Sequence, residues 1–173
     1  SMSSGTIFNW TVTATNGITG FTTPGSSAVI PATTLNNPSN TSGTVTYTVT
    51  PSNNGCVSTP VNFVITVNPA PLVPAQALTT CSGNAFTLSL TNNPPSIILP
   101  LGTTFTWTVS SPVGITGASN QTTPVSTISQ TLVNTTNAPI VVIYSITAST
   151  GTAPSNCSST FTLSVTVNPR PQI

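Results

Sequence analysis

The sequence predicts an all-β protein made of tandem β-sandwich domains of the immunoglobulin type. Apolar residues alternate with Thr, Ser and Asn in short runs, which is the period of half-buried strands. Clusters of Gly, Pro and Asn, such as residues 92–95, separate these runs, and no segment keeps a helical period. The strand motifs also recur later in the chain, and several short strands within about 100 residues are typical of a β-sandwich.

An internal repeat sets the expected domain boundaries. Three segments recur at a spacing of 97 residues (102 minus 5), and the last segment recurs at a spacing of 100 (164 minus 64). The recurring pairs are 5–12 with 102–109, 17–20 with 114–117, Tyr47 with Tyr144, and 64–71 with 164–171. We therefore expect residues 3–70 to form the C-terminal part of one sandwich repeat and residues 71–173 to form a complete repeat. Prolines are expected to stiffen the joint that ends at Pro71.

The strands of the second repeat are predicted from runs of apolar residues at alternate positions. The residues between them, mostly Thr, Ser and Asn, are expected on the solvent face. The inward runs are Phe86, Leu88 and Leu90; Phe105, Trp107 and Val109; Ile128, Gln130 and Leu132; Val142, Tyr144 and Ile146; and Phe161, Leu163, Val165 and Val167.

The first repeat is expected to lack its first strands. The second repeat has residues 71–101 before its Gly-Thr-x-Phe-x-Trp motif, whereas the first has only residues 1–4. Counterparts of the strands expected at 77–81 and 85–91 are therefore missing. Loss of an inner strand leaves unpaired backbone and exposed apolar side chains. We expect the first repeat to be completed by a strand from another molecule or to be partly disordered.

Four aromatic residues lie at inward positions in the middle of predicted strands: Trp10, Trp107, Tyr47 and Tyr144. A buried Trp on a central strand is common in sandwich cores. We therefore interpret all four as core residues, and a sugar-stacking platform is the less favoured alternative.

The composition argues against catalysis. The chain has one Lys or Arg, which is Arg170, and it has no Asp, Glu or His. Acid–base chemistry, hydroxyl activation and hard-metal binding all need such groups, and an arginine does not release its proton in proteins. We expect no enzyme, no cofactor, no metal site and no nucleic-acid partner. No membrane insertion is expected either, because apolar stretches such as residues 97–101 are far too short to span a bilayer.

Three cysteines stand at Cys56, Cys81 and Cys157. In the repeat register Cys56 and Cys157 are equivalent, and Cys81 precedes the second strand of the complete repeat. We predict a Cys81–Cys157 disulfide, with Cys56 left unpaired because its partner belongs to a missing strand. Three reduced, buried cysteines are the alternative. A disulfide would indicate an oxidising compartment.

The second repeat resembles the PKD-like repeats of large Bacteroidota cell-surface proteins. The motifs that carry the resemblance are Cys-Ser-Gly at 81–83, Phe-Thr-Trp-Thr-Val at 105–109, Gly-Ile-Thr-Gly at 114–117, Tyr-Ser-Ile-Thr at 144–147, Cys157, and Val-Thr-Val-Asn-Pro-Arg-Pro at 165–171. Such proteins include gliding-motility adhesins of the SprB type, which the type IX secretion system exports. The resemblance implies one link of an extracellular filament at the cell surface. The classical PKD motif, Trp-Asp-Phe-Gly-Asp-Gly, is absent, and the resemblance implies no catalytic residues.

Two functions follow from these observations. The first is a structural stalk or spacer in an adhesin, whose partners are neighbouring repeats of the same chain and for which self-association is plausible because charge repulsion is absent. The second is a carbohydrate- or surface-binding module that uses the loop 92–101 and an outward threonine face. The threonines are Thr11, Thr13, Thr46, Thr48, Thr106 and Thr108. Ice binding through these threonines is disfavoured because sandwich strands twist.

Overall fold

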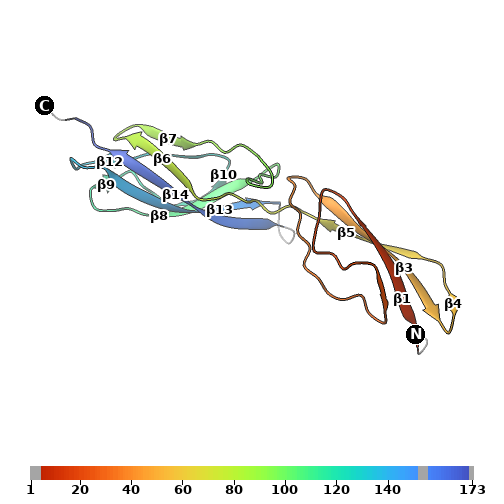
Figure 1. Cartoon of the computed structure of the whole chain (residues 1–173). Coiled ribbons are helices and arrows are strands. Elements are labelled where there is room, and N and C mark those ends of the chain that lie inside the picture. Colours follow the sequence, from red (N-terminus) through yellow and green to blue (C-terminus); the bar gives the residue numbers. More distant parts are fainter. Residues whose placement is uncertain (1–4, 152–155, 172–173) are drawn as a thin grey trace. The chain divides into compact units, whose positions relative to one another are not determined.

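The computed structural model describes residues 5–151 and 156–171, and within them it contains fourteen strands and no helix (Figure 1). The predicted all-β fold is therefore confirmed. The chain divides into two compact units, unit 1 up to Pro69 and unit 2 from Ala70. No helix in the described part of the chain is long and apolar enough to cross a membrane.

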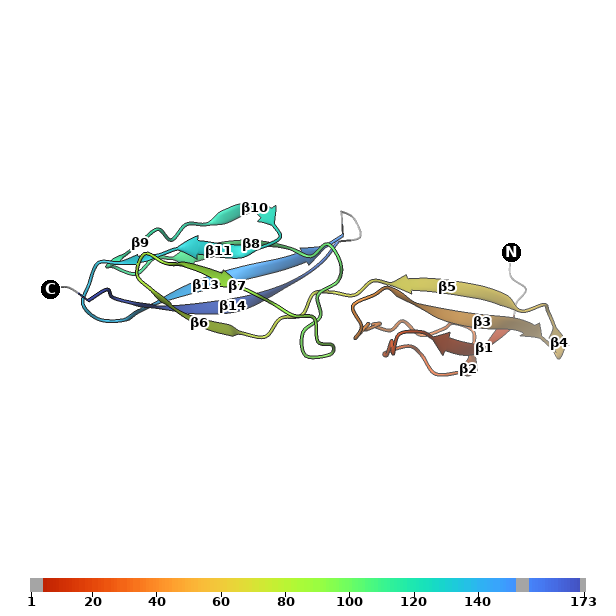
Figure 2. The same ribbon diagram turned by 90° about the horizontal axis from the view of Figure 1, so that it is seen from above.

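Unit 1 is built on a single antiparallel sheet. Its strands are β1 (Ile7–Ala14), β2 (Gly25–Ser27), β3 (Gly43–Asn53), β4 (Cys56–Val57) and β5 (Val61–Val67). Strand β3 pairs with β1 on one side and with β4 and β5 on the other, and β2 pairs with the far side of β1. Strand β5 therefore lies at an edge of the sheet (Figure 2).

The β3–β4 turn of unit 1 follows from its sequence. Asn54 and Gly55 both have positive φ, 47° and 84°. A two-residue turn of this kind matches the twist of the flanking strands, and Asn-Gly is its preferred sequence.

Unit 2 is a sandwich. Its main sheet has the order β10-β8-β13-β14-β6, and two shorter pairs, β7 with β11 and β9 with β12, complete the unit (Figure 2). The strands are β6 (Gln76–Cys81), β7 (Ala85–Leu88), β8 (Thr104–Ser110), β9 (Ile115–Thr116), β10 (Gln121–Val125), β11 (Ile128–Thr131), β12 (Val133–Asn134), β13 (Ile140–Thr150) and β14 (Cys157–Asn168).

The core of unit 2 is formed by the apolar residues at alternate positions of its strands. Leu163, Val165 and Val167 of β14 are fully buried together with Tyr144 of β13. The ring of Phe86 meets that of Tyr144 edge-on, with 5.6 Å between the ring centroids. Strand β7 therefore covers the inner face of the main sheet.

The two units repeat each other in their hydrogen bonds as well as in their sequence. The indole Nε1 of Trp10 donates to the carbonyl oxygen of Thr23 at 2.9 Å, and that of Trp107 donates to Ser119 at 3.0 Å. Gly20 and Gly117 both have positive φ, and a Cβ at either position would collide with a backbone carbonyl. The spacing of 97 residues is therefore a structural equivalence.

A buried asparagine closes each unit in the same way. The side-chain amide of Asn134 donates to the carbonyl oxygens of Ala138 and Val167, both at 2.8 Å. Asn37 donates to the equivalent carbonyls of Thr41 and Val67 at 2.9 and 2.8 Å. Each asparagine thereby ties a loop to the end of the last strand of its unit.

Strand β6 is parallel to β14, which sets the path of the chain through unit 2. The register places Gln76 beside Leu163 and Cys81 beside Asn168. Because both strands run in the same direction, the chain enters unit 2 at one pole and leaves it at the other.

The two strands expected to have no counterpart in the first repeat occur in unit 2 close to the predicted residues, as β6 and β7. Strand β6 is an edge strand of the main sheet and not an inner one, and β7 pairs with β11. Within residues 5–69, unit 1 has the centre of its sheet but no described strand at either of these two positions.

We expect Asn134→Ala to destabilise unit 2 by about 2 kcal/mol, because the buried carbonyl of Val167 and the partly buried carbonyl of Ala138 lose their donor. Chemical denaturation of the full chain measures this change. Asn137→Ala, at an exposed position of the same loop, is the matched control and should lie within about 0.5 kcal/mol of the wild type. Equal effects of the two substitutions would contradict the role of Asn134.

Candidate functional site

Arg170, the one charged side chain of the sequence, is held by hydrogen bonds within unit 2. The Nε of Arg170 donates to the carbonyl oxygen of Ser82 at 2.6 Å, and its NH2 donates to the Oδ1 of Asn84 at 3.4 Å. Both acceptors lie in the turn between β6 and β7. Arg170 therefore fastens the segment after β14 to that turn, beside an open depression of about 760 Å³. At the spacing of 100 residues, Ala70 holds the equivalent position in the first repeat.

Metal binding has no cluster of suitable side chains in the part of the chain that the structure describes. Residues 5–151 and 156–171 contain no group of three or more Cys, His, Asp or Glu side chains that could hold a metal ion. Burial raises the pKa of Tyr144 from 10.0 to about 12, and its hydroxyl donates to the Oε1 of Gln130 at 2.8 Å. The Tyr144 hydroxyl is therefore held in its neutral form and takes part in the hydrogen bonding of the core.

The four aromatic residues assigned to the core all have buried side chains. Trp10, Tyr47 and Trp107 are each about 5% exposed, and Tyr144 is fully buried. The hydroxyl of Tyr47 accepts a hydrogen bond from the backbone N–H of Thr22 at 3.1 Å. None of the four offers a surface on which a sugar ring could stack.

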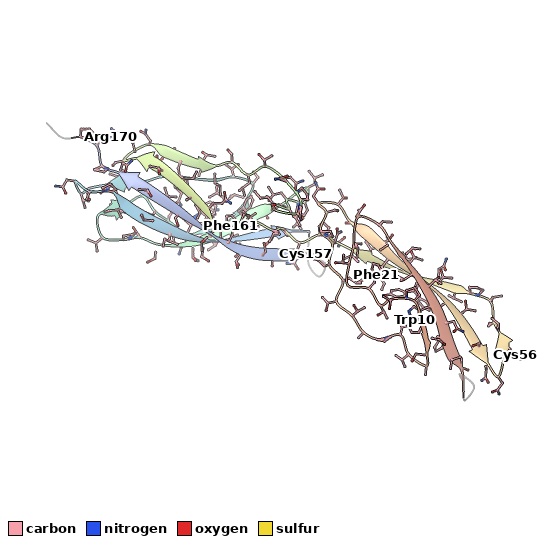
Figure 3. The ribbon with its side chains drawn as sticks, viewed as in Figure 1. Trp10, Phe21, Cys56, Cys157, Phe161 and Arg170 are labelled. Carbon is pink, nitrogen blue, oxygen red and sulfur yellow. The ribbon has the colours of Figure 1, made fainter. Side chains whose placement is uncertain are left out.

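The predicted Cys81–Cys157 disulfide is wrong for this structure, in which all three cysteines are free. Cys157 begins β14, whereas Cys81 lies beside Asn168 at the other end of that strand. Eleven steps of about 3.3 Å separate those two positions, against a Cα separation of at most about 7 Å in a disulfide. Figure 3 shows Cys157 at the end of unit 2 where the chain enters the unit, and Arg170 at the opposite end.

The absence of a Cys81–Cys157 disulfide also affects the interpretation of Cys56 and of the cellular compartment. Cys56 is exposed next to the Asn54-Gly55 turn, and a missing partner strand is not needed to explain why it is unpaired. A disulfide therefore gives no support to the expectation of an oxidising compartment.

The predicted threonine face exists and is arranged in ladders. Thr11 lies opposite Thr48 and Thr13 opposite Thr46 on β1 and β3, and Thr106 lies opposite Thr147 on β8 and β13. Thr11, Thr13 and Thr108 are exposed, whereas Thr46, Thr48 and Thr106 are half-buried. The ladders contain hydroxyl groups but no aromatic or charged side chain.

Unit 1 has an exposed apolar surface, which we call the open face. It comprises Val61, Phe63 and Ile65 of β5, which are 50%, 57% and 43% exposed, together with two grooves beside them. One groove of about 270 Å³ is lined by Pro31, Leu35, Tyr47 and Phe63 among others. A second of about 360 Å³ is lined by Phe8, Ala28, Val29, Ile30, Val49 and Phe63.

The open face lies on the inner side of the sheet. Phe63 is paired with the buried Tyr47, and Val61 is paired with the buried Val49. Paired residues on neighbouring strands share a face. Phe21, Ile30 and Leu35 cover the part of this face around Trp10 and Tyr47, and β5 remains uncovered.

The sequence analysis missed the two buried asparagines. The signal was present, because Leu-x-Asn at 35–37 recurs at 132–134 with the spacing of the other repeats. Asn134 also has the form of a glycosylation triplet, Asn-Thr-Thr, but its side chain is 6% exposed and is occupied by hydrogen bonds.

These features define the class of the protein: an immunoglobulin-like β-sandwich unit preceded by a unit that repeats its central strands as a single sheet, each with an uncharged core. A family model described as a PKD-like domain matches residues 1–71 and 78–171. The chain therefore belongs to the PKD-like domain family. No curated protein and no solved structure matches the chain significantly.

We expect the stability of unit 2 to fall as pH rises above about 10. The raised pKa of Tyr144 means that the unfolded chain loses this proton before the folded chain does. Stability is therefore fully present below pH 10 and is lost as the pH approaches 12. Denaturant unfolding across this range measures the slope.

Tyr144→Phe is the test variant for this dependence. It should be less stable than the wild type at neutral pH, by about 1 kcal/mol for one lost hydrogen bond, yet its stability should fall less steeply above pH 10. An unchanged slope would contradict the assignment to Tyr144.

Proposed function

We propose that this chain is a tension-bearing structural repeat, a stalk or spacer, in an extracellular adhesin filament at the cell surface, and that it has no catalytic activity. Membership of the PKD-like family supports a structural or binding module. The observation that carries the proposal is the parallel pairing of β6 with β14 in unit 2.

The parallel pair connects the two ends of unit 2 mechanically. Tension along the chain pulls β6 from its start and β14 from its end, in opposite directions. The hydrogen bonds between Gln76–Cys81 and Leu163–Asn168 then lie across the direction of pull and are loaded together. A bonded ladder loaded in this way resists more force than one whose bonds open one at a time.

Both ends of unit 2 are also fixed to its body. Leu72 exchanges two backbone hydrogen bonds of 2.8 Å with Ile98, and Val73 lies in the core. At the other pole Arg170 is bound to the β6–β7 turn. Tension therefore reaches the parallel pair through anchored segments.

The composition suits a filament of many neighbouring repeats. A net charge of +1 on 173 residues gives little repulsion between adjacent repeats. With so few charges, little of the stability depends on salt. The partners proposed are neighbouring repeats of the same chain, and export to the cell surface is part of this proposal.

The alternative, a carbohydrate-binding module, has weaker support. Sugar-binding surfaces rely on exposed aromatic rings, and all ten aromatic side chains lie in the described part of the chain. Phe63 is the exposed one among them, and it faces the inner side of its sheet.

Force spectroscopy on the full chain tests the proposal. Handles at Ala70→Cys and Pro171→Cys, with the native cysteines changed to Ser, load the β6–β14 pair in shear. Handles at the native Cys81 and at Asn168→Cys, with the other two cysteines changed to Ser, peel the same pair apart, because these two residues lie opposite each other.

The proposal predicts a rupture force in shear severalfold higher than in peeling, because the two geometries break the same bonds together or singly. Similar forces for the two attachment pairs would count against a tension-bearing role.

A further inference from the structure

We propose that the open face of unit 1 is an acceptor site for a strand–turn–strand segment with the sequence pattern of residues 76–88. The first strand of that segment would pair in parallel with β5, and the second would cover the grooves. This inference concerns a binding surface and goes beyond the role of unit 2 as a spacer.

Unit 2 shows what the open face lacks, because the same positions of the repeat are closed there. Phe63, Ile65 and Val61 are equivalent to Leu163, Val165 and Phe161 at the spacing of 100 residues. Phe63 is 57% exposed, whereas Leu163 is fully buried. Ile65 is 43% exposed, whereas Val165 is fully buried. The difference arises from β6 and β7, which have no counterparts within residues 5–69.

The first groove corresponds to the place that Phe86 occupies in unit 2. Phe86 packs edge-on against Tyr144 and pairs with Gln130. The equivalents of these two residues, Tyr47 and Thr33, line the groove of about 270 Å³. A phenylalanine at the position of Phe86 would therefore meet Tyr47 in unit 1.

The second groove corresponds to the surroundings of Leu88. In unit 2 Leu88 lies beside Phe105. The equivalent of Phe105 in unit 1 is Phe8, which lines the groove of about 360 Å³. Two apolar side chains two residues apart on one strand therefore match the two grooves.

The edge of β5 can receive the first strand. In unit 2, residues 163–167 bond to β13 on one side and to β6 on the other. In unit 1 the equivalent residues 63–67 pair with β3, and no described strand lies on their other side. No charged residue and no proline interrupts β5, and these are the usual devices that keep an edge from pairing.

A free segment fits this surface better than a second copy of the folded chain. The β6 and β7 strands of another copy already pair with their own β14 and β11. Another β5 could extend the edge but would supply no side chain to the grooves. Strand addition of this kind gains affinity from backbone hydrogen bonds and specificity from alternate side chains.

The probe is a synthetic peptide of residues 74–90 carrying Cys81→Ser, titrated into the full chain. The control peptide also carries Leu78→Asn, Phe86→Asn and Leu88→Asn, which keep the length and the absence of charge. We expect saturable binding of the first peptide, with the edge-facing amides of residues 63–68 exchanging at least about tenfold more slowly, since a new hydrogen bond protects each of them.

Two variants of the chain locate the binding surface. Phe63→Ser, on the open face, should weaken the peptide at least about tenfold, which is the loss expected when one large apolar contact is removed. Val64→Ser is the matched control: Val64 is 61% exposed but points to the other face, and its equivalent in unit 2 is Ser164. Its affinity should equal that of the wild type. Because both positions are exposed, neither change should unfold unit 1.

A second version of the peptide that keeps Cys81, with a spin label attached to this residue by a thioether, tests the parallel direction. The equivalence of Asn68 with Asn168, which lies beside Cys81, predicts broadening of the Asn68 amide signal and not of the Val61 signal.

Four results would overturn the proposal: no saturable binding, equal binding of the control peptide, equal losses for Phe63→Ser and Val64→Ser, or broadening at Val61. Self-association of the chain through β5 that excludes the peptide would also overturn it, because the occupant would then be a second copy.

Discussion

The pairing of β6 with β14 is the interaction on which unit 2 depends. It covers the side of β14 that faces away from β13, and the turn after β6 brings Phe86 and Leu88 of β7 over the inner face. It also sets the chain's entrance and exit at opposite poles. Unit 1 contains the same central strands without this pair, and its β5 residues are exposed where those of β14 are buried. Closure, core and connectivity thus follow from one parallel ladder.

The near absence of charge determines which forces hold the structure together. With one charged side chain in 173 residues, stability rests on apolar burial and neutral hydrogen bonds. Asn37 and Asn134 occupy positions that link a loop to the last strand, and their two amide hydrogens satisfy two carbonyls at once. The charged side chain of Arg170 likewise donates a hydrogen bond to a backbone carbonyl, that of Ser82. The same composition leaves the edge of β5 without the lysines that usually block strand addition.

The long strands could be predicted from the sequence, whereas several short strands and the direction of the β6–β14 pairing could not. Alternation around Trp107, Tyr144 and Leu163 identifies β8, β13 and β14, because each has one face in the core. The short strands β2, β9, β10 and β12 escaped prediction because too few residues alternate in them. The disulfide failed for a physical reason: order along the chain does not reveal the direction of pairing, and a parallel β6 places Cys81 at the far end from Cys157. The asparagines could have been found from the repeat, but their role depends on carbonyls brought together by the fold.

Native-state hydrogen exchange of the full chain tests the central claim most directly. Residues 163–167 of β14 lie between two strands, so all their amides should exchange slowly. Residues 63–67 of β5 lie beside β3 alone, so slow and fast amides should alternate along them with a period of two. Uniform protection of both segments would contradict the account, because it would mean that the edge of unit 1 is already closed.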